Sequence, residues 1–233
     1  MKISETHWQQ IENYLKSDDR CVVPLGSTEQ HCLLSLSTDS ILSERVALDA
    51  AEPLGIPVFP ALPYGLAHHW TAYPGTITLN LDVYLGIIRN MLDSLAHAGF
   101  KRILMVNGHG GNMPADECAQ EWAAAKPGMQ VQFHNWYAAP KFATAVRAID
   151  DVASHASWLE NFTFNRLAGV TMPDGAKPLL DMGHLKTLKP EEIRAQAGDG
   201  NIGGRYQRPD SEMESVWAVA VEETRALMSD GWL

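Results

Sequence analysis

Short apolar runs alternate with amphipathic stretches along this chain, and this alternation restricts the folds open to it. Buried strands are predicted where the runs are short and apolar, at residues 21–26, 102–106 and 129–133. Helices are predicted where apolar residues recur at spacings of three and four, at residues 39–52, 81–98, 113–125 and 211–228. Strands separated by helices pair in parallel and are covered on their faces. The pattern therefore predicts a three-layer α/β/α fold with a mainly parallel central sheet, in a single domain spanning residues 1–233.

Two further segments complete the expected organisation. The apolar run 56–62 contains prolines, which cannot donate to a sheet ladder, so this run is predicted at a sheet edge or a strand end. Residues 198–210 are rich in glycine and polar residues and are predicted to form a loop before the last helix.

Composition excludes several classes of function. The formal net charge is −10, which argues against binding nucleic acid or an anionic membrane surface. No apolar run approaches the ~20 residues of a membrane span. The three cysteines, Cys21, Cys32 and Cys118, do not suggest a disulfide framework. The first residues lack the basic and apolar regions of a signal peptide, so we expect a cytoplasmic protein.

The first polar segment follows the first predicted strand. Glu29 and His31 are two residues apart, and Asp39 comes eight residues later, at the expected start of a helix. Ligands bind beyond the carboxyl ends of the strands in open α/β sheets. Glu, His and Asp are ligands that suit zinc, manganese or iron. The alternative is a surface loop in which Asp39 only caps the helix.

The second polar segment is Asn-Gly-His-Gly-Gly-Asn at 107–112, directly after the clearest strand. Three glycines around His109 cost backbone entropy and indicate a tight turn that presents the histidine beside a ligand. A phosphate-binding loop is less favoured because the Lys and Ser/Thr of a P-loop are absent. An oxyanion-hole loop would require a G-x-S-x-G elbow, which this chain lacks. A simple glycine turn remains a further alternative.

The third polar segment contains His155 and Glu160, five residues apart. If His155 precedes a helix that carries Glu160, both side chains can face one cavity. The alternative is a hydrogen-bonded structural histidine and a solvated glutamate.

Taken together, the three segments resemble the motifs of the creatininase family of metal-dependent amidohydrolases. The family's Gly-Ser-x-Glu-x-His run with a following Asp corresponds to Gly26, Ser27, Glu29, His31 and Asp39. Its Asn-Gly-His-Gly-Gly-Asn motif is matched without change by 107–112. Its His-Ala pair with a later Glu corresponds to His155, Ala156 and Glu160. The order and spacing agree over roughly residues 20–165, and the C-terminal loop and helix are similar as well.

The resemblance implies a site for two divalent metal ions, which are zinc, manganese or iron. Its predicted ligands are Glu29, His31, Asp39, His109 and Glu160, with Asp39 bridging the two ions. Three carboxylates and a bridging hydroxide balance the charge of two divalent ions, whereas clustered carboxylates without metal would repel one another.

The resemblance also implies hydrolysis, in which the bridging metal-bound hydroxide attacks a carbonyl and opens a cyclic amide or a related C–N bond. His155 is then the expected general acid that protonates the leaving atom. Trp136, Trp158 and His69 are predicted to bind a small-molecule substrate, with His68 and Trp70 as further candidates. Core or interface packing is the alternative for each of them. The family implies a homo-oligomer, specifically a hexamer.

Departures from the family pattern bear on the substrate. Creatinine hydrolases carry Glu where this chain has Gly111, so creatinine itself is not the expected substrate. The segment 32–38 is one residue shorter than usual and lacks a second His. The His-Ala-Ser-Trp-x-Glu-Asn-Phe form resembles members that open a diketo-inositol (3-dehydro-scyllo-inosose) ring. Ring-opening C–C hydrolysis is therefore one alternative function, and non-catalytic binding of metal or sugar is another.

Overall fold

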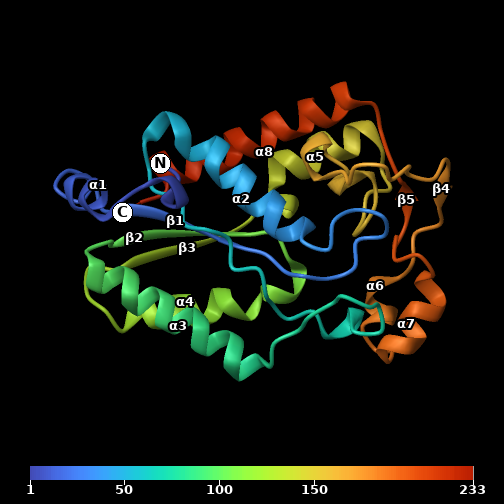
Figure 1. Cartoon of the computed structure of the whole chain (residues 1–233), viewed down its shortest axis with the longest axis horizontal. Coiled ribbons are helices and arrows are strands. Elements are labelled where there is room, and N and C mark those ends of the chain that lie inside the picture. Colours follow the sequence, from blue (N-terminus) through green and yellow to red (C-terminus); the bar gives the residue numbers. More distant parts are fainter. Residues whose placement is uncertain (233) are drawn as a thin grey trace.

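The protein is built around a short parallel sheet, seen in a computed structural model that describes residues 1–232 (Figure 1). Strands β1 (Arg20–Leu25), β2 (Arg102–Asn107) and β3 (Gln130–Asn135) pair in parallel in the order β1-β2-β3. The first two strands are buried at every position except the first. The three predicted strands and their parallel pairing are confirmed.

The proline-containing run 56–62 lies along β1 but does not form a continuous strand. Single parallel bridges join Val58 to Val22 and Leu62 to Leu25. Pro57 and Pro60 lack a backbone N–H, so the run cannot maintain a regular ladder. The run is therefore an incomplete fourth strand at the sheet edge, as its prolines predict.

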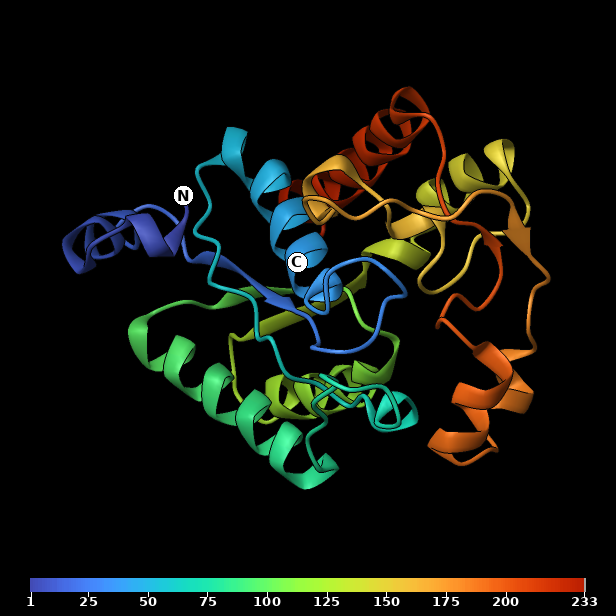
Figure 2. The ribbon, with the colours of Figure 1, turned by 45° about the vertical axis from the view of Figure 1, so that its right-hand side comes forward.

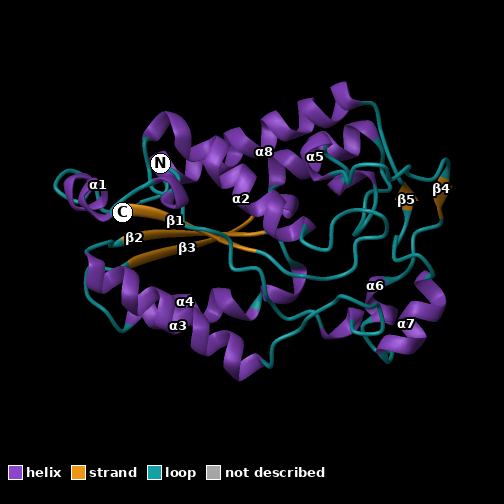
Figure 3. Cartoon of the chain, viewed as in Figure 1, coloured by secondary structure: helices purple, strands orange, loops and turns teal. Residues whose placement is uncertain are grey.

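Helices cover both faces of the sheet (Figures 1 and 3). One face carries α2 (Thr38–Ala51), α5 (Pro140–Ile149) and α8 (Asp210–Asp230), and the other carries α3 (Leu81–Ala98) and α4 (Pro114–Ala124). Successive strand residues point to opposite faces. Accordingly, Val22 and Leu104 pack with the first set of helices, whereas Cys21 and Ile103 pack with the second. The predicted three-layer α/β/α arrangement is confirmed.

The rest of the chain forms shorter elements, several of them beyond the carboxyl ends of the strands (Figure 2). The remaining helices are α1 (Trp8–Tyr14), α6 (Met182–Leu185) and α7 (Pro190–Ala197), and β4 (Ala176–Lys177) pairs antiparallel with β5 (Gly204–Arg205). The 3-10 turns are η1 (Ile3–Glu5), η2 (Glu52–Leu54), η3 (His68–Trp70), η4 (Gly110–Asn112), η5 (Trp136–Ala138), η6 (Trp158–Glu160) and η7 (Thr163–Asn165).

A small separate core joins these outer elements to the end of the sheet. Trp70 of η3 packs with Leu185 of α6 and with Ile193 and Ala197 of α7. This cluster fixes α6 and α7 beside the segment that follows the sheet edge. No helix in residues 1–232 is long and apolar enough to cross a membrane.

Candidate metal centre and its cavity

The three polar segments meet at the carboxyl edge of the sheet. Glu29 and His31 lie in the loop after β1, and His109 lies in the turn after β2. Asp39 is the second residue of α2. The prediction that Asp39 caps this helix is wrong, because Ser37 occupies the cap position. Glu160 is the last residue of η6. All five predicted ligands are therefore neighbours, although they come from four separate segments of the chain.

Glu29, Asp39 and His109 form the first of two ligand groups. Nδ1 of His109 lies 2.9 Å from Asp39 Oδ2 and 3.3 Å from Glu29 Oε1. The other ring nitrogen of His109 donates to the carbonyl oxygen of Leu66 at 3.1 Å. That hydrogen bond orients the ring so that Nδ1 faces the two carboxylates, as is typical of metal-binding histidines.

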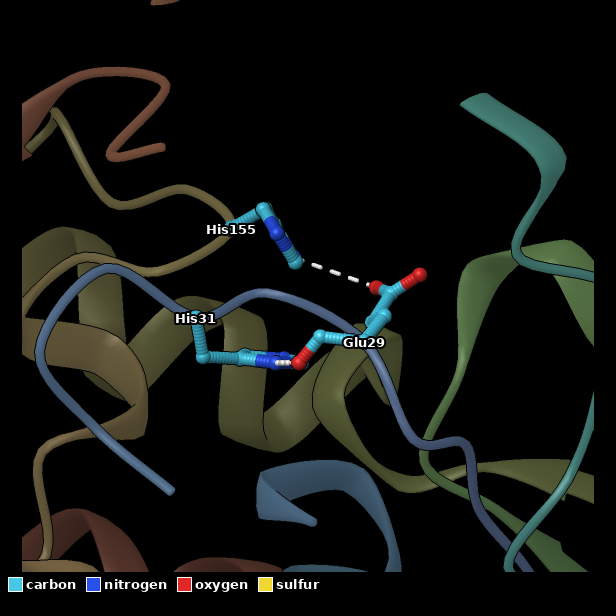
Figure 4. A group of neighbouring side chains, drawn as sticks. All are labelled: Glu29, His31 and His155. Carbon is cyan, nitrogen blue, oxygen red and sulfur yellow. Dashed lines mark hydrogen bonds and ion pairs between the residues drawn. The ribbon is translucent and has the colours of Figure 1, made fainter. Parts of the chain in front are cut away.

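His31, Asp39 and Glu160 form the second group. Nε2 of His31 lies 3.0 Å from Asp39 Oδ1 and 3.8 Å from Glu160 Oε2. The other ring nitrogen of His31 donates to the backbone oxygen of Glu29 at 3.1 Å (Figure 4). Each oxygen of the Asp39 carboxylate thus faces a different histidine, which is the arrangement expected of a bridging ligand.

The donor set fits a pair of divalent ions. Oε2 of Glu29 is buried and has no hydrogen-bond partner, although an unpaired buried carboxylate oxygen is costly. The candidate ligand atoms in each group lie within 4.8 Å of one another. Carboxylate and imidazole ligands suit zinc, manganese and iron. A bound ion would satisfy the unpaired oxygen of Glu29.

The charges in this cluster perturb one another strongly. Burial alone would lower the pKa of His31, but the carboxylates of Asp39 and Glu160 outweigh it and raise that pKa to about 10. Burial raises the pKa of Glu160 to about 7 and also raises the pKa of Glu29. The nearby histidines overcome burial at Asp39 and hold its pKa below the usual range. Without metal, protons on the histidines balance the carboxylates, and bound metal ions would take their place.

Two glycines in the turn after β2 are required by close contacts. A Cβ on Gly108 would lie 2.5 Å from the backbone oxygen of Asp39. A Cβ on Gly111 would lie 2.0 Å from the oxygen of Leu66 and 2.5 Å from His109 Nε2. Of the alternatives left open by the sequence, the structure therefore favours a tight turn that holds His109. The same crowding explains why position 111 carries no larger side chain here.

An unusual backbone turn positions Glu160. Ala156 adopts a positive φ of 59°, a conformation that costs energy for any residue with a side chain. Its backbone N–H donates to Glu160 Oε2 at 2.7 Å. Ser157 caps the 3-10 turn that carries Glu160, and its side chain accepts a hydrogen bond from the backbone N–H of Leu159. His155 thus precedes a single 3-10 turn that bears Glu160, rather than the longer helix that the spacing suggested.

His155 lies beside the metal-ligand cluster and has two neighbours that fix its ring. Its Nδ1 is 3.7 Å from Glu29 Oε1 (Figure 4). Its ring stacks on Trp70, with centroids 4.7 Å apart and planes inclined by 13°. Glu29, His31 and His155 form a third group that could hold an ion, so geometry alone allows His155 to be a ligand.

Gln30 holds Nε2 of His155 through both its side chain and its backbone. The side-chain oxygen of Gln30 accepts from Cys32 N at 3.0 Å, and its amide nitrogen donates to Gly200 O at 3.2 Å, so both contacts fix the orientation of the amide. That amide nitrogen also lies 2.8 Å from His155 Nε2. The backbone oxygen of Gln30 lies 3.1 Å from the same Nε2. Nε2 therefore accepts from the amide of Gln30 in one tautomer and donates to its backbone oxygen in the other, and in both cases Nδ1 faces Glu29.

A cavity of about 620 Å³ opens beside the cluster. His68, His69 and Trp70 line it, together with Glu29, Asp39, His109, His155 and Glu160. Trp136 and Trp158, which the resemblance suggested as substrate-binding residues, do not line it. They are 1% and 0% exposed and belong to the core formed with α2, α5 and α8. Their large apolar rings pack more favourably there, which is the alternative noted for them from the sequence.

Other lining residues carry no sequence motif. Leu66, Met113, Tyr137, Met182 and Lys186 all border the cavity. They come from loops and short helices between the motifs, and their residue types are common in any core or surface. No pattern in the sequence distinguishes them, so only the folded chain identifies them.

A three-layer α/β fold that gathers carboxylates and histidines at the carboxyl edge of its sheet places this chain among α/β proteins with a candidate metal centre. The sequence matches the family model described as "Creatininase: Creatinine amidohydrolase" over residues 4–231. The chain therefore belongs to the creatininase family of hydrolases, as its motifs predict.

Characterised relatives of different activities share parts of the sequence. The creatinine amidohydrolase of Pseudomonas putida is 30% identical over 115 residues, which cover 46% of this chain and 44% of that protein. The mycofactocin precursor peptide peptidase of Mycolicibacterium smegmatis is 36% identical and covers 40% of each chain. The 3-dehydro-scyllo-inosose hydrolase of Thermotoga maritima is 29% identical, covering 44% of this chain and 33% of that protein. This chain thus matches less than half the length of each relative.

Solved structures share the fold over nearly the whole chain. A creatininase described as a manganese form aligns with a TM-score of 0.81 and 18% identity, covering 98% of both chains. A mutant creatininase described as the zinc–zinc type aligns with a TM-score of 0.82 and 18% identity, covering 98% of this chain and 97% of that one. These similarities establish a creatininase-like fold for this protein.

Proposed function

We propose that this protein is a two-metal hydrolase that cleaves an amide C–N bond in a small molecule. The proposal depends on the position of Asp39 between the two ligand groups. Each of its carboxylate oxygens faces a different histidine, and the residue borders an open cavity. Two divalent ions bound there would lower the pKa of a shared water toward neutrality and polarise a carbonyl group. Zinc and manganese are the leading candidates, because related creatininases are described as holding them.

His155 is the proposed general acid. Burial and the positive charge of His31 lower the pKa of His155, so the ring is neutral before reaction. Its Nδ1 faces the cluster, where it can take a proton from the attacking water and then pass that proton to the leaving nitrogen. Trp70 stacks on the ring and limits its rotation. In amide hydrolysis the leaving nitrogen must gain a proton, and a residue at this position can supply it.

The relatives favour an amide over a polyol substrate, whereas the cavity lining fits either. Apolar side chains such as Leu66, Met113 and Met182 stand beside hydrogen-bonding ones such as His69, Tyr137 and Ser154. Two of the relatives are named for amide or peptide hydrolysis. Ring opening of a diketo-inositol is the second candidate, supported by the relative named for that activity.

The test is metal analysis followed by a substrate screen. Protein purified without chelators should contain close to two divalent ions per chain. This protein is then incubated with cyclic amides, short peptides and keto-inositols, and the products are followed by mass spectrometry. The proposal would be supported if the metal-loaded protein hydrolysed an amide and if this activity were lost both in chelated protein and in the Asp39→Asn variant.

Each alternative has its own result in the same screen. Turnover of a keto-inositol alone would favour the C–C hydrolase. Two tightly bound ions with no turnover of any class would favour a non-catalytic binding protein. Metal content near zero would contradict the two-metal site itself.

We also propose that the chain forms a homo-oligomer, as family resemblance implies. Leu81 and Val83 on α3 are 52% and 46% exposed, and an apolar groove of about 700 Å³ runs along this helix. Exposed apolar surface of this kind is typical of subunit contacts. Light scattering of the purified protein would test this, and a mass equal to one chain would contradict it.

A further inference from the structure

A single lysine stands at the cavity, and it has no role in the metal cluster. Lys186 caps the C-terminal end of α6 and lines the cavity. It is the only Lys or Arg among the described residues that border this cavity. Among residues 1–232, no acidic side chain forms an ion pair with it. A cation with no partner beside a binding cavity is available for a ligand.

The fold holds Lys186 in place. The preceding residue, Leu185, is 2% exposed and packs in the small core with Trp70 and Ile193. Trp70 in turn stacks on His155. Packing thus links the backbone at Lys186 to the ring of His155 through Leu185 and Trp70, while the Lys186 side chain itself is exposed.

Two histidines belong to the same cavity wall as Lys186. His68 and His69 also line it, and their rings are 3.9 Å apart. Burial lowers the pKa of His69, and the charge of Lys186 lowers it further, so Lys186 acts on this wall electrostatically.

We infer that Lys186 binds a carboxylate on the substrate, so that the substrate class is an amide carrying a negative charge. This inference rests on the proposed function, which places the carbonyl group at the metal cluster. The apolar side chains between would then contact the body of the substrate.

Binding of paired inhibitors can test this without turnover. Hydroxamates chelate metal ions, so the probes are the monohydroxamates of succinic, glutaric and adipic acids, each compared with the same compound bearing a neutral amide in place of the carboxylate. Their affinities for metal-loaded protein are measured by calorimetry. We expect at least one carboxylate probe to bind about fivefold or more tightly than its neutral partner, the effect of one charge pair at a partly exposed site. Raising the salt concentration should reduce this preference.

Variants identify the residue responsible. Lys186→Met should remove the preference and leave binding of the neutral probes unchanged, whereas Lys186→Arg should retain most of it. Lys189→Met removes the same charge three residues away, outside the cavity, and should behave as wild type. Equal binding of charged and neutral probes by wild type, or a preference that survives in Lys186→Met, would overturn the inference while leaving the two-metal proposal intact. If no hydroxamate bound at all, both would be wrong.

Discussion

A variant of His155 can distinguish catalysis from metal binding. The structure allows this residue to be a general acid, a metal ligand or a packing residue. We expect His155→Ala to keep both metal ions and to fold normally. Five other residues already supply ligand atoms to the two groups that share Asp39. The ring of His155 is held instead by Gln30 and by stacking on Trp70.

The size of the effect follows from these contacts. Loss of general acid assistance should lower kcat by about 10²–10⁴, which corresponds to about 2.7–5.5 kcal/mol of activation free energy. The loss of stability should be smaller, about 1–2 kcal/mol, because the amide of Gln30 still donates to Gly200 after the ring is removed. The loss in kcat should also shrink for substrates with good leaving groups, which need little protonation.

The assay combines metal content, melting temperature and kcat on two substrates that differ in their leaving groups. His134→Ala is the matched control, because His134 is a buried histidine on β3 that bonds Thr224 away from the cluster. It should lose stability and keep kcat per folded molecule. Loss of about one metal ion in His155→Ala would refute the general-acid role and make His155 a ligand of the third group. A fall in stability with unchanged kcat would make it a packing residue.

Three further predictions concern the metal cluster. Asp39→Ala should lower the metal content and activity more than His31→Ala, because Asp39 belongs to both ligand groups and His31 to only one of those two. If elemental analysis found two ions in Asp39→Ala, the bridging role would be excluded. In chelated protein the pKa of His31 is raised from 6.5 to about 10, so its contribution to stability is complete below about pH 6.5 and is lost as the pH rises toward 10. Melting temperatures should therefore decline over this range in chelated protein and not in metal-loaded protein, and parallel curves would contradict this. Gly111→Ala should reduce both metal content and melting temperature, since its Cβ would meet Leu66 and His109; a variant with normal values would show that the turn can relax.

Much of the fold could be predicted from local pattern. The strands and main helices follow from apolar runs and from spacings of three and four, because burial of one face of each element is a local requirement. The interrupted run 56–62 was also predictable, since Pro57 and Pro60 remove backbone donors wherever they occur. The parallel sheet then follows from the alternation of the two kinds of element, and it places the residues after β1 and β2 at the same edge.

The sequence by itself also determined which residues belong to the cluster, because Glu29, His31, Asp39, His109 and Glu160 lie in short motifs of unusual composition. Only the tertiary structure decided their arrangement: which oxygen of Asp39 faces which histidine, and which nitrogen of each ring is free.

The same limit applies to the surroundings of the cluster. Trp136 and Trp158 lie in the core, whereas Lys186 reaches the cavity, and neither outcome is encoded by spacing. The physical reason is that a side chain's role depends on its neighbours, and here those neighbours come from distant parts of the chain. Lys186 borders the cavity because Leu185 packs with Trp70, more than a hundred residues earlier in the sequence.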